Sequence, residues 1–160
     1  MPKEIERKFL VTGTGYRDQN KSKLYKQGYI SIDKERTVRA RVAGEKGYIT
    51  IKGINHGTVR SEYEYEIPAD ETAKIIEELC LRPIIEKRRY KYTAQDGHIW
   101  EIDEFTGENS GLIVAEIELT KESEQFKKPE WIGEEVTDDA KYYNSNLVNN
   151  PYIKWHDKNE

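Results

Sequence analysis

The chain has little cysteine, little histidine and no long hydrophobic run, and each absence narrows what it can be. A single cysteine, Cys80, excludes an internal disulfide and a Cys-x-x-Cys zinc site, and its apolar neighbours predict a structural thiol. The histidines lie in separate segments without metal-ligand spacing. No apolar run approaches the roughly 18 residues that cross a membrane, and the N-terminus lacks a signal-peptide pattern. We therefore expect a cytoplasmic protein with no membrane partner.

Charge is abundant, but neither sign dominates. The chain carries 26 Lys and Arg against 30 Asp and Glu, a net charge of −4, which does not indicate a nucleic-acid partner. Charged residues make up 35% of the sequence, yet 11 Tyr, 3 Trp and 3 Phe distinguish it from a disordered chain. The sequence therefore predicts one folded domain over residues 1–160, in which the many charges have a defined arrangement.

Turn residues divide most of the chain into short alternating segments that are typical of β-strands. The predicted strands are 3–11, 25–32, 36–43, 47–53, 59–67, 84–93, 98–105 and 111–120. A helix is expected over 70–81 with Asp70 as its N-cap, and a second over 138–149. Residues 121–135 are expected to be irregular or partly helical. This pattern predicts an α+β protein, mainly β, with one large antiparallel sheet.

Charged side chains occupy one face of almost every predicted strand. Because successive side chains point to opposite faces, Glu4, Glu6 and Lys8 share one face of the first strand, opposite Ile5 and Phe9. An ordinary half-buried sheet would present a mixed polar face to water. Here the charges come in acidic or basic blocks, and eight strands can close into a barrel with a narrow lumen. We therefore interpret the charged faces as the lining of a lumen.

The two kinds of charge indicate what such a lumen would bind. Arginine and lysine side chains from several strands would bind a compact, multiply anionic ligand. Paired carboxylates repel one another unless a cation lies between them, and they suit hard divalent cations such as Mg²⁺ or Mn²⁺. The acidic pairs are Glu4 and Glu6, Glu62 and Glu64, and Glu116 and Glu118. Together these features favour metal-assisted phosphoryl chemistry.

The motif Glu4-x-Glu6-x-Lys8 resembles the ExExK signature of the CYTH superfamily, the triphosphate tunnel metalloenzymes. Further segments follow in the family's order along the chain: 37–41, 48–52, 60–66, 85–90, 100–103 and 115–118. The resemblance implies a closed eight-stranded antiparallel β-barrel, a tunnel with a charged interior and helices packed outside. It also implies a metal-dependent enzyme that acts on a small-molecule triphosphate.

Site residues are carried over from the resemblance by position. The divalent metals would be held by Glu4, Glu6, Glu116 and Glu118, assisted by Asp103, Glu62 and Glu64. The phosphates would be bound by Lys8, Arg39, Arg41, Lys52, Lys87 and Arg89. The residues implied in catalysis are Glu4, Glu6, Lys8, Glu116 and Glu118. Lys154 matches a basic residue at the tunnel mouth, and Tyr29 could point inward or pack outside.

The resemblance implies hydrolysis of a triphosphate by a metal-activated water, with Mg²⁺ or Mn²⁺ as cofactor. Inorganic tripolyphosphate is the favoured substrate because few residues remain outside the barrel to form a pocket for a base or a thiazolium ring. Three alternatives stay open: an adenylate cyclase, a thiamine- or nucleoside-triphosphatase, and a non-catalytic triphosphate-binding module. The sequence determines neither the preferred metal nor the oligomeric state, which is monomer or homodimer.

Overall fold

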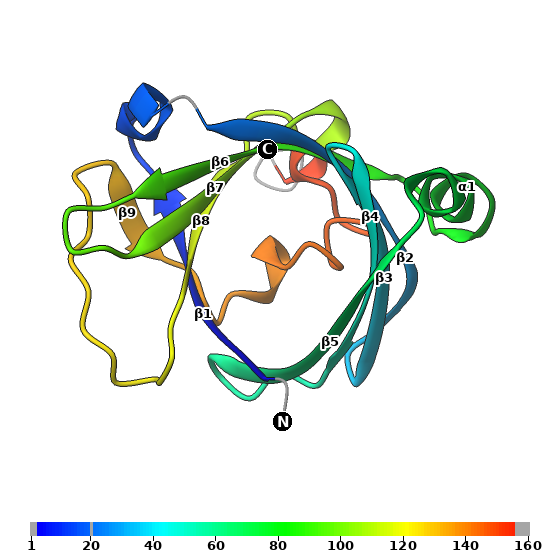
Figure 1. Ribbon diagram of the computed structural model, residues 1–160, viewed down its shortest axis with the longest axis horizontal. Helices are drawn as coiled ribbons and strands as arrows, with labels where there is room; N and C mark the ends of the chain where they lie inside the picture. Colours follow the sequence, from blue (N-terminus) through cyan, green and yellow to red (C-terminus); the bar gives the residue numbers. More distant parts are fainter. Residues whose placement is uncertain (1–2, 20, 156–160) are drawn as a thin grey trace.

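The computed structural model describes residues 3–19 and 21–155, which form a closed barrel of eight antiparallel strands (Figure 1). The strands are β1 (Lys3–Val11), β2 (Ser22–Asp33), β3 (Arg36–Ala43), β4 (Lys46–Gly53), β5 (Val59–Ile67), β6 (Ile85–Thr93), β7 (Ile99–Phe105) and β8 (Ile113–Glu118). Their order is β5-β4-β3-β2-β6-β7-β8-β1, and the start of β1 pairs with β5 to close the ring. The predicted barrel is confirmed.

The strand register places charged residues beside one another on the inner face. Glu6 lies opposite Glu118 and Lys8 opposite Glu116 across the β1–β8 pair. Directly opposed residues of an antiparallel pair point to the same face of the sheet. The charged blocks of the individual strands therefore meet as continuous patches inside the barrel.

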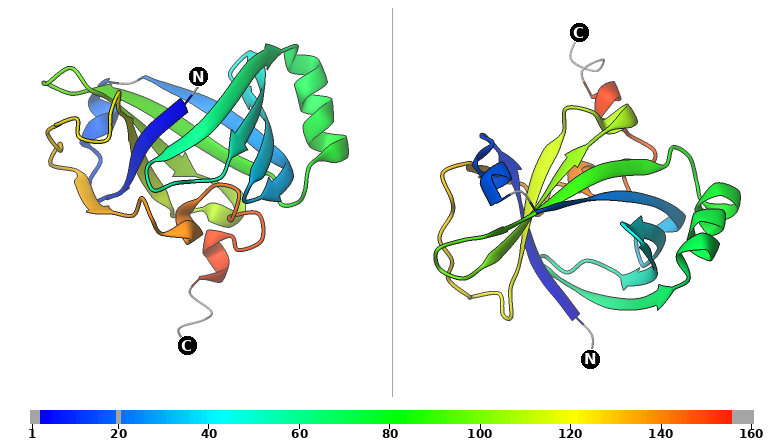
Figure 2. Two further views of the ribbon diagram at one scale, coloured as in Figure 1. Left: turned by 90° about the horizontal axis from the view of Figure 1, so that it is seen from below. Right: turned by 45° about the horizontal axis from the view of Figure 1, so that its top comes forward.

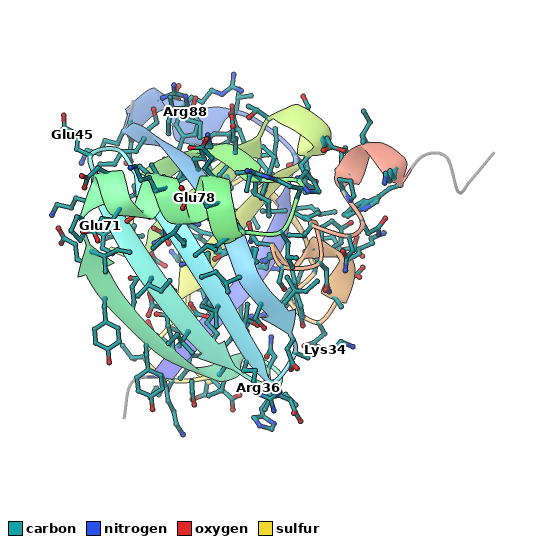
Figure 3. The ribbon with its side chains drawn as sticks, turned by 90° about the vertical axis from the view of Figure 1, so that its right-hand side faces the viewer. Lys34, Arg36, Glu45, Glu71, Glu78 and Arg88 are labelled. Carbon is teal, nitrogen blue, oxygen red and sulfur yellow. The ribbon has the colours of Figure 1, made fainter. Side chains whose placement is uncertain are left out.

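The apolar outer face is covered on one side by the helix α1 (Ala69–Leu79), which contacts β2, β3 and β4 (Figure 1). Ile76 of this helix is buried, while Glu71 and Glu78 point away from the barrel (Figure 3). A Cβ at Gly47 would lie 2.0 Å from the Thr72 hydroxyl oxygen, so this close approach of α1 to β4 requires glycine. Helix α1 thus covers part of the outer wall.

A second cover lies over the outer face of β1, β7 and β8. It consists of a 3₁₀ turn, η1 (Gly15–Gln19), the segment 119–131, and a ninth strand, β9 (Ile132–Glu135), which pairs with β1. Phe9 and Trp100 pack edge-to-face beneath it, with ring centroids 5.5 Å apart. The apolar residues of this cluster therefore pack on the outer face of the barrel, away from its charged lumen.

The C-terminal segment 136–155 closes one end of the barrel. Its 3₁₀ turn η3 (Ala140–Tyr142) lies within the ring of strands in Figure 1 and at one end of the barrel in the left view of Figure 2. Leu147 and Val148 are buried in a cluster with Tyr29, Ile85 and Phe105, which anchors the segment. The remaining short turns are η2 (Gly107–Asn109) and η4 (Tyr152–Lys154).

Several local predictions are wrong. Residues 138–149 form no α-helix: Asn146 donates to the Ala140 carbonyl, and Asn144 accepts a hydrogen bond from Lys87, so these side chains favour turns and tertiary contacts. Residues 121–131 are irregular, which is one of the two alternatives expected for 121–135, but residues 132–135 form strand β9. Helix α1 begins at Ala69 behind Pro68, so Asp70 lies in its first turn, near the positive end of the helix dipole, and is not the cap.

The outer layer is also less helical than expected, since α1 is the single α-helix within residues 3–19 and 21–155. No helix of this described part of the chain is long and apolar enough to cross a membrane.

His98 fastens the outer segment 119–131 to the β6–β7 turn. Its Nε2 lies 2.6 Å from Glu124 Oε2, and its Nδ1 lies 3.0 Å from Asp96 Oδ2. The contact with Glu124, followed by that with Asp96, raises the pKa of His98. A raised histidine pKa stabilises the fold below its unfolded pKa of about 6.5, and this stabilisation is lost as the pH rises through the folded value.

We expect His98→Gln to lower the Tm more at pH 6 than at pH 9, because only the protonated imidazole forms both ion pairs. Thermal unfolding at the two pH values measures this. His56→Gln, at an exposed position between β4 and β5, is the matched control and should leave both Tm values unchanged. An equal loss at both pH values in His98→Gln would contradict the ion-pair role.

Candidate active site in the barrel lumen

A cavity of about 370 Å³ fills the lumen and is lined by inward-pointing side chains from all eight barrel strands. Twelve of the charged residues predicted from the sequence line it: Glu4, Glu6, Lys8, Arg39, Arg41, Lys52, Glu62, Glu64, Lys87, Arg89, Glu116 and Glu118. Tyr29 also lines the cavity, which resolves the two orientations left open for it. The period-two pattern of the strands therefore located most of this lining correctly.

An acidic cluster occupies β1 and β8, where Glu4, Glu6, Glu116 and Glu118 lie on neighbouring inner positions. Burial raises the pKa values of Glu4, Glu6 and Glu118, and neighbouring carboxylates raise them further. Burial also acts on Glu116, but Lys8 and Arg89 outweigh it and lower its pKa to about 2. The carboxylates of this cluster therefore repel one another without enough cations to balance them.

The donor chemistry of the acidic cluster fits a hard divalent cation, which prefers carboxylate oxygens. Two of these carboxylates form ion pairs with lysines: Lys52 Nζ lies 3.1 Å from Glu4 Oε2, and Lys8 Nζ lies 3.5 Å from Glu116 Oε1. Within residues 3–19 and 21–155, no three acidic or histidine side chains converge in a preformed metal site. Metal binding would therefore require these carboxylates to exchange their lysine partners for the cation.

A basic cluster occupies β3 and β6. Arg39 and Arg41 share one carboxylate, with Nη2–Oε1 distances of 3.5 and 3.3 Å to Glu64. The Nε atoms of both arginines are buried without a hydrogen-bond partner. Burial, then Arg39 and Arg89, lower the pKa of Arg41 to about 10. Buried guanidinium groups with unused donors are suited to bind phosphate oxygens.

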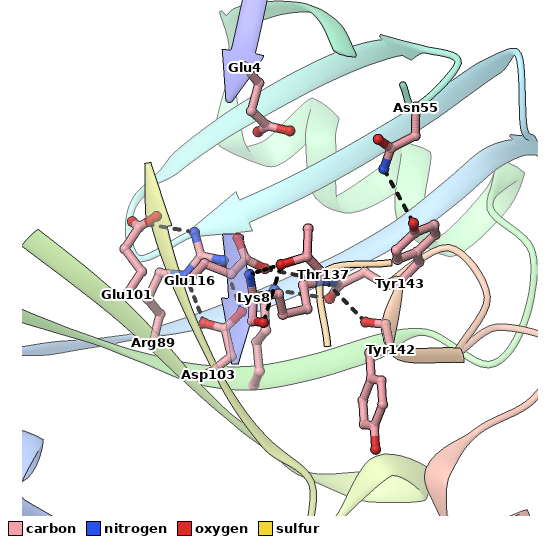
Figure 4. Close-up of polar contacts among 12 residues, drawn as sticks. Glu4, Lys8, Asn55, Arg89, Glu101, Asp103, Glu116, Thr137, Tyr142 and Tyr143 are labelled. Carbon is pink, nitrogen blue, oxygen red and sulfur yellow. Dashed lines mark hydrogen bonds and ion pairs between the residues drawn. The ribbon is translucent and has the colours of Figure 1, made fainter. Parts of the chain in front are cut away.

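Asp103 lies beneath this cluster and does not line the cavity. Arg89 donates to it through Nε and Nη2 at 2.7 and 2.9 Å, and Lys87 Nζ lies 2.7 Å away (Figure 4 shows the Arg89 pair). Burial alone would raise its pKa, but Arg89 and Lys87 hold that pKa well below its usual range. Its carboxylate is thus paired with the side chains of both Arg89 and Lys87. Lys154 is exposed on η4 and does not line the cavity either.

The C-terminal segment supplies polar groups that the sequence analysis missed. Lys8 Nζ donates to the Tyr142 carbonyl at 3.1 Å, and Asn55 Nδ2 lies 3.4 Å from the Tyr143 hydroxyl (Figure 4). Lys87 Nζ donates to Asn144 Oδ1 at 3.1 Å. This segment forms only turns, and the helical spacing of residues 138–149 does not indicate which of their side chains reach the lumen.

Further lining residues were missed on the strands themselves: Arg60, Lys91 and Glu101. The alternation of side chains was sufficient to find these three, because each shares a strand face with a predicted site residue.

A closed antiparallel barrel whose lumen holds opposed acidic and basic clusters defines a tunnel-shaped binding protein for a multiply charged anion. The chain belongs to the CYTH domain family, whose family model matches residues 2–148.

Two curated relatives are similar over nearly their whole length. An inorganic triphosphatase of Acetivibrio thermocellus is 57% identical over 152 residues, which cover 95% of this chain and 97% of that protein. An inorganic triphosphatase of Nitrosomonas europaea is 35% identical over 148 residues, covering 91% of this chain and 96% of that protein. Among solved structures, a crystal structure of an inorganic triphosphatase aligns with a TM-score of 0.65 at 31% identity, covering 92% of this chain and 95% of that one.

We expect Glu6→Gln to raise the Tm of the metal-free protein at pH 8. Burial, then Glu116, raise the pKa of Glu6, so the fold loses stability as the pH rises from its unfolded value through its folded one. A neutral glutamine removes this cost above both values. Thermal unfolding in EDTA measures the change, with Glu45→Gln, exposed at the β3–β4 turn, as the control. A lower Tm in Glu6→Gln would show that its charge stabilises the empty fold.

Proposed function

We propose that this chain is a metal-dependent inorganic triphosphatase that hydrolyses tripolyphosphate to diphosphate and phosphate. The observation that carries the proposal is the opposition of an acidic and a basic cluster across one cavity of about 370 Å³. The first would hold divalent cations and the second the anionic oxygens of the substrate. Family membership and the names of the two curated relatives support the same activity.

The basic residues would bind and orient the substrate. Arg39 and Arg41 offer unused donors towards the lumen, and Arg89 is held in place by Asp103. Lys8 and Lys52 would exchange their carboxylate partners for phosphate oxygens as those carboxylates turn to a cation. Binding would thus replace weak pairs inside the lumen with a charge-neutral assembly, and the guanidinium groups would stabilise the charge that develops on the leaving diphosphate.

Glu4, Glu6, Glu116 and Glu118 are proposed to hold Mg²⁺ or Mn²⁺, with Glu62 and Glu64 assisting. When bound, such a cation would neutralise phosphate charge and lower the pKa of a coordinated water. We place Asp103 outside this set, because its carboxylate is occupied by Arg89 and Lys87, and assign it the role of holding those two cations. Lys154 is likewise placed outside the phosphate-binding set.

The closed end of the barrel favours a small linear substrate. Tyr143, Asn144 and Thr137 line the cavity from the C-terminal segment, so an attached base or thiazolium ring would have to extend through the opposite end. We propose inorganic tripolyphosphate for this reason. From the sequence we also propose that the protein is a single domain, that it is cytoplasmic, that it has no nucleic-acid partner, and that it is a monomer or a homodimer.

A substrate panel tests the proposed function. Tripolyphosphate, thiamine triphosphate and ATP are each incubated with Mg²⁺ or Mn²⁺, and released phosphate and cyclic AMP are measured. We expect phosphate from tripolyphosphate at a rate well above that from the other two substrates. Cyclic AMP from ATP, preferred turnover of thiamine triphosphate, or binding of tripolyphosphate without turnover would each overturn the proposal.

We expect Glu4→Gln and Glu116→Gln each to lower metal-dependent tripolyphosphate hydrolysis about 100-fold or more, since even outer-shell partners of a metal typically cost 10- to 100-fold. Steady-state phosphate release measures this. Glu108→Gln, exposed on η2 outside the barrel, is the control and should retain full activity. Full activity in either lumen variant would rule out its carboxylate as a metal ligand.

A further inference from the structure

Among the arginines of the basic cluster, Arg41 is held least firmly by its hydrogen bonds. Arg89 makes two short hydrogen bonds with Asp103, whereas Arg41 makes one side-chain hydrogen bond, of 3.3 Å, with Glu64, a carboxylate that it shares with Arg39. Arg41 also lies at the edge of the range of the Tyr48 ring, whose centroid is 5.8 Å from its Cζ atom. The Arg41 Nε atom is buried and unpaired. An arginine in this setting needs another group to fix its direction.

The ring of Tyr25 on β2 lies close to both Arg41 and Arg89. The Arg41 Cζ atom lies 4.9 Å from the centroid of the Tyr25 ring, and the Arg89 Cζ atom lies 4.8 Å from it. Both distances are within the about 6 Å over which a guanidinium is attracted to an aromatic ring. Tyr25 is 9% exposed and lines the lumen, so these contacts are largely shielded from water.

The strand register explains why one ring reaches both arginines. Tyr25 pairs directly with Lys87 on β6 and with Ala43 on β3. Arg89 lies two residues after Lys87 on β6 and Arg41 two residues before Ala43 on β3, so both are in the diagonal positions that long side chains and aromatic rings can span. The small side chain of Ala43 leaves room for the ring beside β3.

The ring also counteracts a repulsion. Arg41 and Arg89 are like charges in a poorly solvated lumen, and the proximity of Arg89 is one cause of the lowered pKa of Arg41. The negative face of an aromatic ring attracts a nearby guanidinium group, which partly offsets the repulsion between the two cations. A hydrocarbon side chain of similar size would fill the space without this attraction.

We propose that Tyr25 is a positioning residue for substrate binding: its ring fixes Arg41, and secondarily Arg89, in the direction that receives phosphate oxygens. This inference rests on the proposed function for its substrate. Its action is through the ring, and the hydroxyl group is not required.

Calorimetric titration with tripolyphosphate in EDTA tests the inference without turnover. We expect Tyr25→Phe to bind within about twofold of the wild type and Tyr25→Leu to bind roughly tenfold more weakly, through loss of two cation–π contacts. In an Arg41→Gln background, Tyr25→Leu should cost no more than about threefold, because its main partner is gone. Tyr65→Leu, 59% exposed on the outer face of β5, is the matched control and should bind normally.

Kinetics provide a second readout. With Mg²⁺, Tyr25→Leu should raise the KM for tripolyphosphate by more than it lowers kcat, and Tyr25→Phe should restore both. If the wild type binds tripolyphosphate without hydrolysing it, the proposed function fails while the titration still tests Tyr25.

Three results would overturn the inference: normal binding by Tyr25→Leu, weakening by Tyr25→Phe equal to that by Tyr25→Leu, or the full cost of Tyr25→Leu in the Arg41→Gln background. The Tm of each variant is measured first. Should Tyr25→Leu fail to fold, Tyr25→Met replaces it in every comparison, because it also fills the site without an aromatic ring.

Discussion

Repulsion between like charges inside a closed barrel is the constraint on which the rest of this structure depends. Glu4 and Glu6 have raised pKa values because they are largely removed from solvent near other carboxylates, and Arg41 has a lowered one because it is buried near other arginines. These repulsions lower the stability of the protein when no ligand is bound. A ligand that brings a cation to the carboxylates and an anion to the guanidinium groups relieves both repulsions at once, so the same energy that weakens the empty protein favours binding.

The outer layers make this arrangement possible. Apolar side chains pack outside the barrel under α1 and under the segment 119–131, and a second apolar cluster packs at the end that the C-terminal segment closes. The hydrophobic clusters therefore stabilise the fold without filling the charged cavity. The C-terminal segment then closes one end with polar groups that reach Lys8 and Lys87. Stability is therefore supplied by the outer faces of the strands and by one closed end, which lets the rest of the inner face carry charges that an ordinary core would exclude.

The sequence predicts this inner face well because strand periodicity is local. Glu4, Glu6 and Lys8 could be assigned to the lumen from alternation alone, and the structure agrees. The sequence predicts poorly those features of the fold and the site that depend on contacts between distant segments. Residues 138–149 have helical spacing, but their asparagines serve tertiary contacts. The alternation of β7 places Asp103 on the inner face of the strand. Whether its carboxylate is free to bind a metal ion or pairs with Arg89 depends on the register between β6 and β7, which the sequence of one strand does not show.

The most direct test of the account is a crystal structure of the protein with Mn²⁺ and tripolyphosphate, using the anomalous signal of manganese to locate the metal. The account predicts Mn²⁺ within coordination distance of carboxylates from both β1 and β8, with phosphate oxygens on Arg39, Arg41 and Arg89. Glu4 and Glu116 should have left Lys52 and Lys8. Manganese outside the lumen, or phosphates bound on the outer surface while these ion pairs stay intact, would contradict it.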